Sequence, residues 1–207
     1  MRRETLIGGI AVIALIGILA FFFMQRDEKK KYPQGGSQII AFGDSLVEGV
    51  GASPGHDFVS ILSDRLRSPI INAGRAGDTT AAGLLRLNEA VLAQDPKIVI
   101  VLLGGNDALR RIPKEETFRN LETIIDRIQG RGAAVILIGV RGGILSDSYK
   151  KSFSSIAAEK GAFYIPDILD DIFGNARLIS DPIHPNDQGY ALMADRIEPV
   201  LKMVMAK

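Results

Sequence analysis

A serine that directly follows a strand-like apolar run is the first candidate for chemistry in this sequence. Residues 42–46 read FGDSL, and Gly49 and Gly51 follow soon afterwards. A serine at a strand end, before a glycine-containing turn, can present its hydroxyl above the edge of a sheet, and it becomes a nucleophile when a base takes its proton. Asp44 and Ser45 could equally be turn formers and helix caps. The segment lacks the G-x-S-x-G pattern of α/β-hydrolases, which disfavours that fold.

A matching base lies near the other end of the chain. Residues 181–186 read DPIHPN, so that Asp181 stands three residues before His184, one of two histidines in the chain. The prolines on both sides of His184 fix φ and favour a stiff loop over a helix. Asp181 can there accept a hydrogen bond from one imidazole nitrogen and leave the other free as a general base. A structural loop histidine is the competing interpretation, and a metal site would need further ligands, which are not evident nearby.

Two glycine-rich segments offer groups that could stabilise an oxyanion. Residues 72–80 read NAGRAGDTT and residues 104–107 read GGND. Gly77 can expose a backbone N–H because it has no side chain, and Asn106 can offer its amide NH₂. Asp107 is expected to brace its loop rather than to touch substrate. The competing interpretation is turn chemistry with an N-cap, in which Asp78 or Thr79 starts the next helix.

Alternating strand-like and helix-like segments would position these residues. Strands are expected at 39–42, 70–72, 98–103, 135–140 and 162–165. Helices are expected at 58–67, 80–92, 115–129, 148–160 and 187–205. This alternation predicts an α/β domain in which a parallel sheet lies between helices. Ligands of such sheets bind at the carboxyl ends of the strands, which is where the polar segments fall. The loops at 108–113 and 141–148 are expected to shape the pocket.

The first part of the chain predicts attachment to a membrane. Residues 6–23 are an unbroken run of apolar and glycine residues, and a helix of that length spans about 27 Å, enough for a hydrocarbon core. A cleaved signal peptide is the alternative, but its apolar region is shorter, about 7–15 residues, and ends in small residues rather than in FFFM. We therefore expect an uncleaved transmembrane anchor within 1–31, a linker at 32–37 and one domain at 38–207.

Charge and composition exclude several classes of function. Residues 32–207 carry a net charge of about −2 once the six basic and three acidic side chains of 1–31 are set aside, which gives no reason to bind nucleic acid. The chain has no cysteine, which excludes disulfides, thiolate metal sites and cysteine catalysis. More basic residues follow the apolar run than precede it, and this count alone favours a cytoplasmic domain.

The four polar segments together resemble the SGNH hydrolases, also called the GDSL family. The resemblance covers about 37–203, and NAGRAGDTT and LLGGNDALR look most like the bacterial multifunctional acyl-CoA thioesterases, lysophospholipases and arylesterases. It implies a three-layer, flavodoxin-like α/β/α sandwich with a five-stranded parallel sheet. It also implies that Ser45, His184 and Asp181 form a triad, and that Ser45, Gly77 and Asn106 supply the oxyanion hole. Many relatives are exported, which favours a domain outside the cytoplasm, against the charge count.

The resemblance implies a serine esterase that hydrolyses carboxylic esters or thioesters and needs no metal or cofactor. Expected partners are a small-molecule or lipid ester and, through the anchor, a membrane. Two alternatives remain open: a carbohydrate O-deacetylase on the same fold, and a non-catalytic module that binds a component of the cell envelope. Acyl-chain length and oligomeric state do not follow from the sequence.

Overall fold

The structure is a computed structural model of the chain, and it describes residues 32–140 and 147–207. Lys31–Lys207 form a compact unit of their own. The predicted membrane span at 6–23 lies outside the described residues. Within the described ranges, no helix is long and apolar enough to cross a membrane. The anchor, the linker and the domain boundary at 38 therefore stay predictions.

Five parallel strands form one sheet, in the order β2-β1-β3-β4-β5. Their bounds are β1 Gln38–Gly43, β2 Ile70–Gly74, β3 Pro96–Leu102, β4 Ala134–Ile138 and β5 Phe163–Ile165. Each strand begins and ends within two residues of its predicted bounds. The β-branched runs that suggested central strands became β3 and β4, which have neighbours on both sides in the sheet. The predicted α/β class and five-stranded parallel sheet are confirmed.

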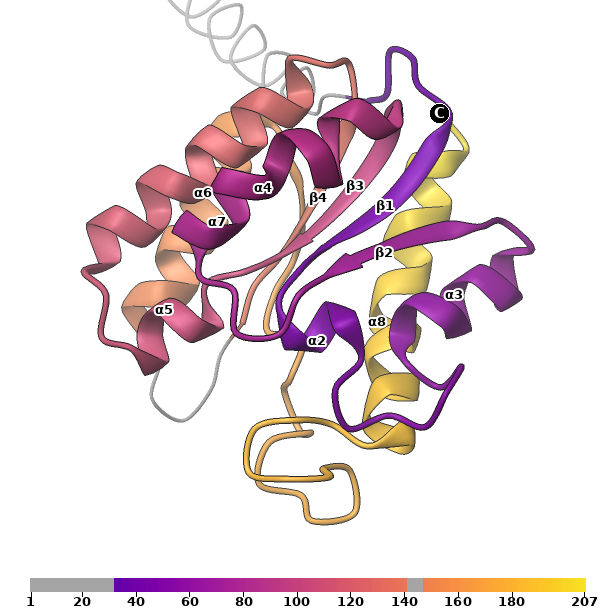
Figure 1. Cartoon of the computed structure of the whole chain (residues 1–207), viewed down its shortest axis with the longest axis vertical. Helices are drawn as coiled ribbons and strands as arrows, with labels where there is room; N and C mark the ends of the chain where they lie inside the picture. Colours follow the sequence, from indigo (N-terminus) through magenta and orange to yellow (C-terminus); the bar gives the residue numbers. More distant parts are fainter. Residues whose placement is uncertain (1–31, 141–146) are drawn as a thin grey trace, which may run out of the picture. The chain divides into compact units, whose positions relative to one another are not determined.

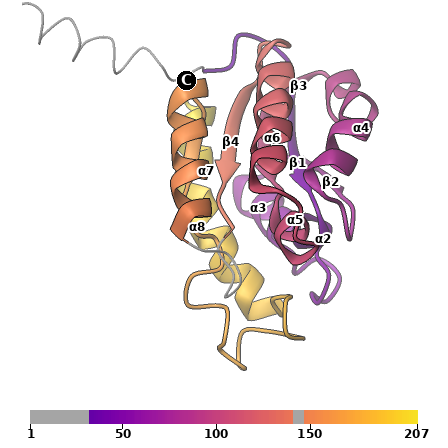
Figure 2. The ribbon, with the colours of Figure 1, turned by 90° about the vertical axis from the view of Figure 1, so that its left-hand side faces the viewer.

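Helices cover both faces of the sheet and make the fold three-layered (Figure 1). The helices are α2 Ser45–Glu48, α3 Phe58–Leu66, α4 Thr80–Ala90, α5 Gly105–Leu109, α6 Lys114–Gln129, α7 Asp147–Lys160 and α8 Asp187–Met205, with a short 3₁₀ turn at Leu92–Gln94. One face of the sheet packs against α3 and α8, and the other packs against α4, α6 and α7. In the view turned by 90°, α6 and α7 lie in front of the sheet (Figure 2).

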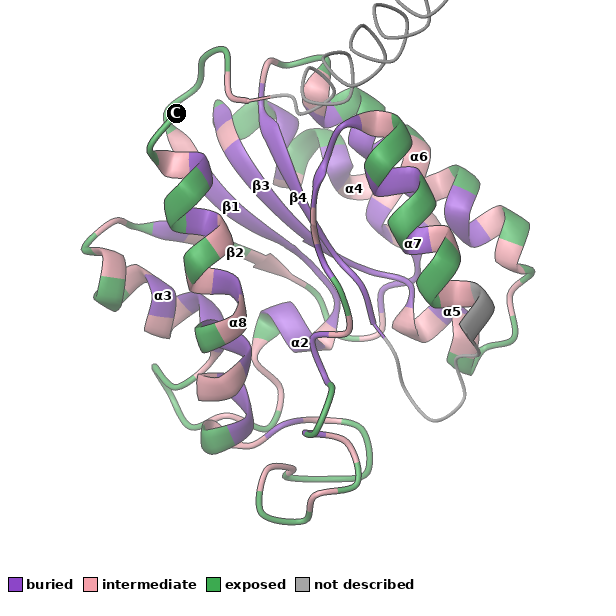
Figure 3. Cartoon of the chain, turned by 180° about the vertical axis from the view of Figure 1, so that it is seen from behind, coloured by how far each residue is buried: buried purple, intermediate pink, exposed green. Residues whose placement is uncertain are grey.

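The two faces of the sheet arise from the alternation of side chains along each strand. In β1, Ile39 and Ala41 join the core beneath α3 and α8, whereas Ile40 and Phe42 join the core beneath α4, α6 and α7. Successive side chains of a strand point to opposite faces, so a strand between two helical layers must be apolar at every position. Seen from behind, the strands are largely buried and the outer sides of the helices are exposed (Figure 3).

The carboxyl ends of the strands carry two short helices that the sequence did not suggest. The segment after β1 was predicted as a turn but forms α2, and the GGND segment after β3 forms the start of α5. Helices of four and five residues have too few turns for a periodic apolar pattern, which is the signal that a helix prediction depends on. Both short helices lie at one end of the sheet, together with the long loop that precedes α8 (Figure 1).

Candidate active site

Ser45 is held at the tip of β1 by a tight strand-to-helix junction. Asp44 caps α2 because its Oδ1 accepts the N–H of Leu46 at 3.0 Å, and Ser45 is the first residue of the helix. Gly43 is required at the junction because a Cβ there would lie 2.2 Å from the carbonyl oxygen of Leu102 in the neighbouring strand. The first N–H groups of a helix have no intrahelical acceptor, so the backbone N–H of Ser45 is available to a ligand.

His184 and Asp181 approach Ser45 from the loop before α8. The Nε2 atom of His184 lies 3.0 Å from the Oγ of Ser45, and its Nδ1 lies 2.7 Å from the Oδ2 of Asp181. Because a carboxylate only accepts, the proton of the neutral ring is assigned to Nδ1, which leaves Nε2 to accept from the serine hydroxyl. The structure brings these three side chains together, although the serine and the histidine are 139 positions apart in the sequence.

The DPIHP segment folds back on itself and so fixes the imidazole. The Oδ1 of Asp181 accepts the backbone N–H groups of Ile183 and His184, both at 2.8 Å. The N–H of Ser180 also donates to the carbonyl of His184 at 2.9 Å, which closes a tight turn. The hydrogen bond from the His184 ring and those from the backbone hold the pKa of Asp181 below its ordinary value. Asp181 is therefore ionised at neutral pH and can stabilise a protonated imidazole.

Asn106 and Gly77 lie on two adjoining segments beside Ser45. Asn106 lies in the first turn of α5, and its Nδ2 donates to the carbonyl of Asp78 at 3.0 Å and to the Oδ2 of Asp44 at 3.3 Å. Gly77 precedes α4 and has φ of 80°, a conformation that glycine adopts without strain. Its carbonyl accepts from the guanidinium of Arg110 at 2.8 Å. The described structure thus brings both predicted donors to the same end of the sheet as the nucleophile.

Two further residues brace this end of the sheet. Asp107 is fully buried and accepts the N–H of Thr80 at 2.8 Å and its hydroxyl at 2.5 Å, so it braces its loop as predicted. Arg86 of α4 donates to the carboxylate of Asp78 at 2.5 Å and to the carbonyl of Gly43 at 2.9 Å. The sequence reasoning missed Arg86. The available signal was a lone cation in the apolar helix segment TAAGLLRLNEA.

Asp44 is a second carboxyl group beside the nucleophile, and its surroundings are unlike those of Asp181. It is only 2% exposed, and its burial raises its pKa from 3.8 to about 7. The nearby carboxylates of Asp78 and Asp107 also raise this pKa, whereas the N–H of Leu46 and the ring of His184 lower it. Desolvation outweighs the hydrogen bond because a charged carboxylate loses its hydration on burial. Asp44 therefore exchanges a proton near neutral pH.

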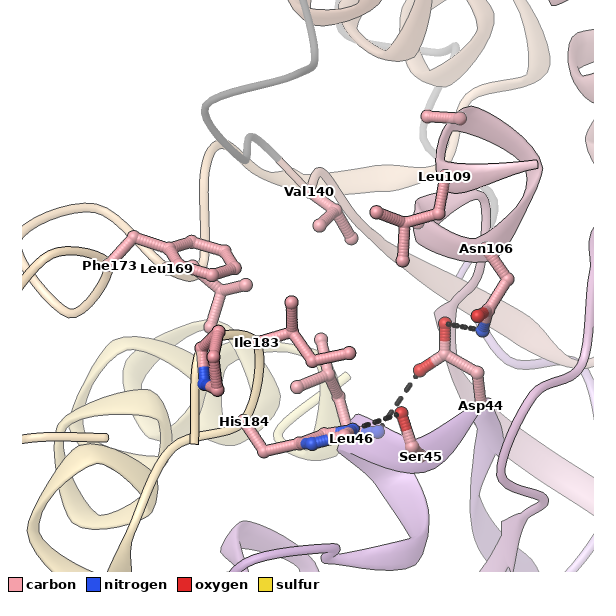
Figure 4. A pocket seen from close by; sticks show the side chains of 13 residues that line it. Asp44, Ser45, Leu46, Asn106, Leu109, Val140, Leu169, Phe173, Ile183 and His184 are labelled. Atoms are coloured by element: carbon pink, nitrogen blue, oxygen red, sulfur yellow. Dashed lines mark hydrogen bonds between the residues drawn. The ribbon is translucent and has the colours of Figure 1, made fainter. Parts of the chain in front are cut away.

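An apolar pocket of about 240 Å³ opens beside Ser45 (Figure 4). Ser45, His184, Asp44 and Asn106 form its polar side. Its apolar wall consists of Leu46, Leu109, Val140, Leu169, Phe173, Pro182 and Ile183. The loop at 108–113 contributes Ala108 and Leu109 to this lining, as expected from the sequence, whereas 141–146 lie outside the described residues. Leu109 and Ile183 are each more than two-fifths exposed, at 45% and 43%, and mark the mouth.

Within 32–140 and 147–207, no group of three or more His, Asp or Glu side chains is arranged to hold a metal ion. The second histidine, His56, is exposed in the loop before α3 and is not among the residues that line the pocket. The expectation that the reaction needs no metal or cofactor stays a prediction.

This arrangement of a serine, an imidazole and a carboxylate at the carboxyl edge of a parallel α/β/α sheet is that of a serine hydrolase. Comparison with known proteins identifies the particular group. Residues 41–192 match the GDSL-like Lipase/Acylhydrolase family. The chain belongs to this family, and it is a hydrolase of the GDSL esterase type, as the resemblance predicted.

Named relatives are similar to the chain over most of their length. Esterase TesA of Pseudomonas aeruginosa is 26% identical over 178 residues, which cover 81% of this chain and 89% of TesA. Thioesterase 1/protease 1/lysophospholipase L1 of Escherichia coli is 27% identical over 76% of this chain and 79% of its own. A crystal structure of the psychrotrophic esterase EstA from Pseudoalteromonas sp., inhibited by monoethylphosphonate, has a TM-score of 0.74 and 26% identity, and covers 82% of this chain and 99% of EstA.

Proposed function

We propose that this protein is a serine esterase that hydrolyses carboxylic esters and thioesters of apolar acyl groups. The observation that carries the proposal is the unbroken hydrogen-bonded series from Ser45 through His184 to Asp181 at the polar side of an apolar pocket. Relatives described as an esterase, a thioesterase and an arylesterase support the same reaction class.

The proposed reaction has two steps. The Oγ of Ser45 attacks the acyl carbonyl carbon while the Nε2 of His184 takes the serine proton, and Asp181 stabilises the resulting imidazolium. His184 then gives this proton to the leaving alcohol or thiol, which departs and leaves an acyl-serine ester. Water, deprotonated by His184, attacks that ester, and the serine leaves as it regains the proton. The acid is released and the enzyme returns to its starting state.

The negative charge on the tetrahedral oxygen needs donors, and three are assigned. These are the backbone N–H groups of Ser45 and Gly77 and the side-chain amide of Asn106. Both amide hydrogens of Asn106 are in use, one to Asp78 and one, in the longer 3.3 Å bond, to Asp44. The oxyanion would replace Asp44 as the acceptor of the longer bond, since the bond to Asp78 is the shorter at 3.0 Å.

The lining of the pocket supports an apolar acyl group over an acetyl group. Seven of the lining residues are Leu, Ile, Val, Phe or Pro, and burial of each methylene of an acyl chain against them contributes about 0.8 kcal/mol. A carbohydrate deacetylase needs only a small acyl site and polar surroundings for the sugar.

Hydrolysis of p-nitrophenyl esters from acetate to decanoate, by the full chain and by Ser45→Ala, tests the proposal. We expect activity that disappears in Ser45→Ala, with kcat/KM higher for octanoate than for acetate. Activity confined to acetate would support the deacetylase instead. A folded protein that hydrolyses none of the esters and does not react with a fluorophosphonate would contradict the enzyme assignment and favour the binding module.

We further propose that residues 1–31 attach the enzyme to a membrane with residues 38–207 outside the cytoplasm. The support is the apolar run at 6–23 and the export of many family members. Protease treatment of intact cells, followed by detection of the domain, tests this orientation. A domain that is protected until the membrane is opened would contradict it.

A further inference from the structure

Resting on the proposed function, we infer that Arg110 is a positioning residue that fixes the two oxyanion donors relative to each other. Arg110 follows directly after α5, and its backbone N–H donates to the carbonyl of Asn106 at 3.0 Å. Its guanidinium Nη2 donates to the carbonyl of Gly77 at 2.8 Å. Arg110 is thus hydrogen-bonded to both Asn106 and Gly77, the two proposed oxyanion donors that do not belong to α2.

Gly77 needs such a partner more than its neighbours do. It is half-buried, follows the exposed Arg75 and Ala76, and has φ of 80° in a loop. Glycine has the largest conformational freedom of any residue, so the orientation of the peptide groups on both sides of Gly77, its N–H included, depends on the bonds made around it. A Cβ built on Gly77 would lie 3.5 Å from the Nη2 of Arg110, which shows that the guanidinium packs directly over the glycine.

The other bonds between the two segments hold neighbouring positions. Asn106 itself binds the carbonyl of Asp78, and Asp107 binds Thr80. On the preceding side, the N–H of Ala76 donates to the carboxylate of Glu48. Among the side-chain hydrogen bonds of the described ranges, the one from Arg110 is the bond that reaches Gly77 itself. A backbone turn from the N–H of Asp78 to the carbonyl of Arg75, at 3.2 Å, also spans Gly77. Loss of the Arg110 bond would therefore loosen the glycine while the turn and both flanking anchors remain.

Because of where Arg110 lies, its loss should affect the reaction rate more than the stability of the fold. The residue is exposed, so a single charge-assisted hydrogen bond there contributes little to the free energy of unfolding. The rate, in contrast, depends steeply on donor placement, because a shift of about 1 Å can lower turnover about 100-fold. Arg110 is not among the residues that line the acyl pocket, so its loss should not weaken substrate binding.

Three variants of the full chain test the inference. Arg110→Met keeps the length of the side chain and removes the donor, and Arg110→Lys keeps the charge but not the planar fork. Arg111→Met is the matched control, because Arg111 is equally exposed and basic and makes no side-chain hydrogen bond to Gly77. We measure kcat and KM for p-nitrophenyl octanoate and the rate of inactivation by a fluorophosphonate, whose phosphoryl oxygen occupies the oxyanion position.

We expect kcat of Arg110→Met to fall about 10- to 100-fold with KM within about twofold of wild type. The inactivation rate should fall in the same proportion, Arg110→Lys should lie between, and Arg111→Met should match wild type. A kcat of Arg110→Met within twofold of wild type, a change in KM alone, or an equal loss in Arg111→Met would each overturn the inference. If Arg110→Met does not fold, the kcat of Arg110→Lys decides by the same criteria. A wild-type protein that reacts with neither ester nor fluorophosphonate would instead refute the proposed function.

Discussion

Asp44 makes the stability of the domain depend on pH in a way that one substitution can isolate. Its folded-state pKa is raised from 3.8 to about 7 because the carboxyl is buried, so the folded state disfavours the charged form. A raised pKa contributes stability that is fully present below the unfolded value of 3.8 and is lost as pH rises through 7. The whole shift corresponds to about 4 kcal/mol, and the part that falls between pH 5 and pH 8 is about 2–3 kcal/mol.

Asp44→Asn should abolish this pH-dependent part. The amide keeps an oxygen that can accept from the N–H of Leu46, although its NH₂ group would face the amide of Asn106 across a 3.3 Å contact. That donor–donor contact costs about 1 kcal/mol or more, but by the same amount at every pH. Relative to wild type, Asp44→Asn should therefore become more stable by about 2–3 kcal/mol when the pH is raised from 5 to 8.

The assay is urea unfolding of wild type and variant at both pH values, with a protein that covers residues 32–207, since Lys31–Lys207 form a compact unit. Asp170→Asn serves as the control because Asp170 is exposed on the loop before α8. The difference in stability between Asp170→Asn and wild type should be the same at pH 5 and pH 8. A difference between Asp44→Asn and wild type that is equal at pH 5 and pH 8 would refute the reasoning, because it would mean that Asp44 is charged in the folded state throughout.

Two further substitutions test the site. Asn106→Ala should lower kcat about 10²- to 10³-fold with little change in the melting temperature, because it removes an oxyanion donor on the half-exposed first turn of a short helix; near-normal turnover would contradict the assigned role. Leu169→Trp should fill part of the pocket and lower kcat/KM for octanoate at least about tenfold more than for acetate. An equal effect on both esters would mean that the acyl chain does not enter this pocket.

The regular elements were predictable because each carries its own signal. The apolar runs at 98–103 and 135–140 predicted β3 and β4, and the predicted bounds of α8 match those observed. Patterns of this kind involve residues that are close together in the sequence, so they can be recognised from the sequence alone. The short helices α2 and α5 were missed because each follows directly after a strand and is set by that junction, with a side-chain cap at α2. Asp44 forms such a cap at α2, and its role depends on atoms that only the folded junction brings together.

The candidate site, too, could be predicted from the sequence only in part. Ser45, His184, Asp181, Gly77 and Asn106 could be named from the sequence, because strand ends, prolines and glycines show which polar residues fall in loops at one edge of a sheet. The distances between them, and the apolar wall formed by residues from four separate segments, required the structure. The membrane anchor at 6–23 stays a prediction of the sequence.

The sequence by itself determined the class of chemistry, because the types of side chain and their order along the chain are local facts. Only the tertiary structure decided that the pKa of Asp44 is raised and which groups Arg110 and Arg86 bind. The pKa of a carboxyl depends on how much water and how many other charges surround it, and the partner of an arginine depends on which carbonyl lies within about 3 Å. The pKa and the bonding partner therefore both depend on residues that are distant in the sequence and adjacent in the fold. Asp44 beside Asn106 and Gly77 beside Arg110 are the examples here.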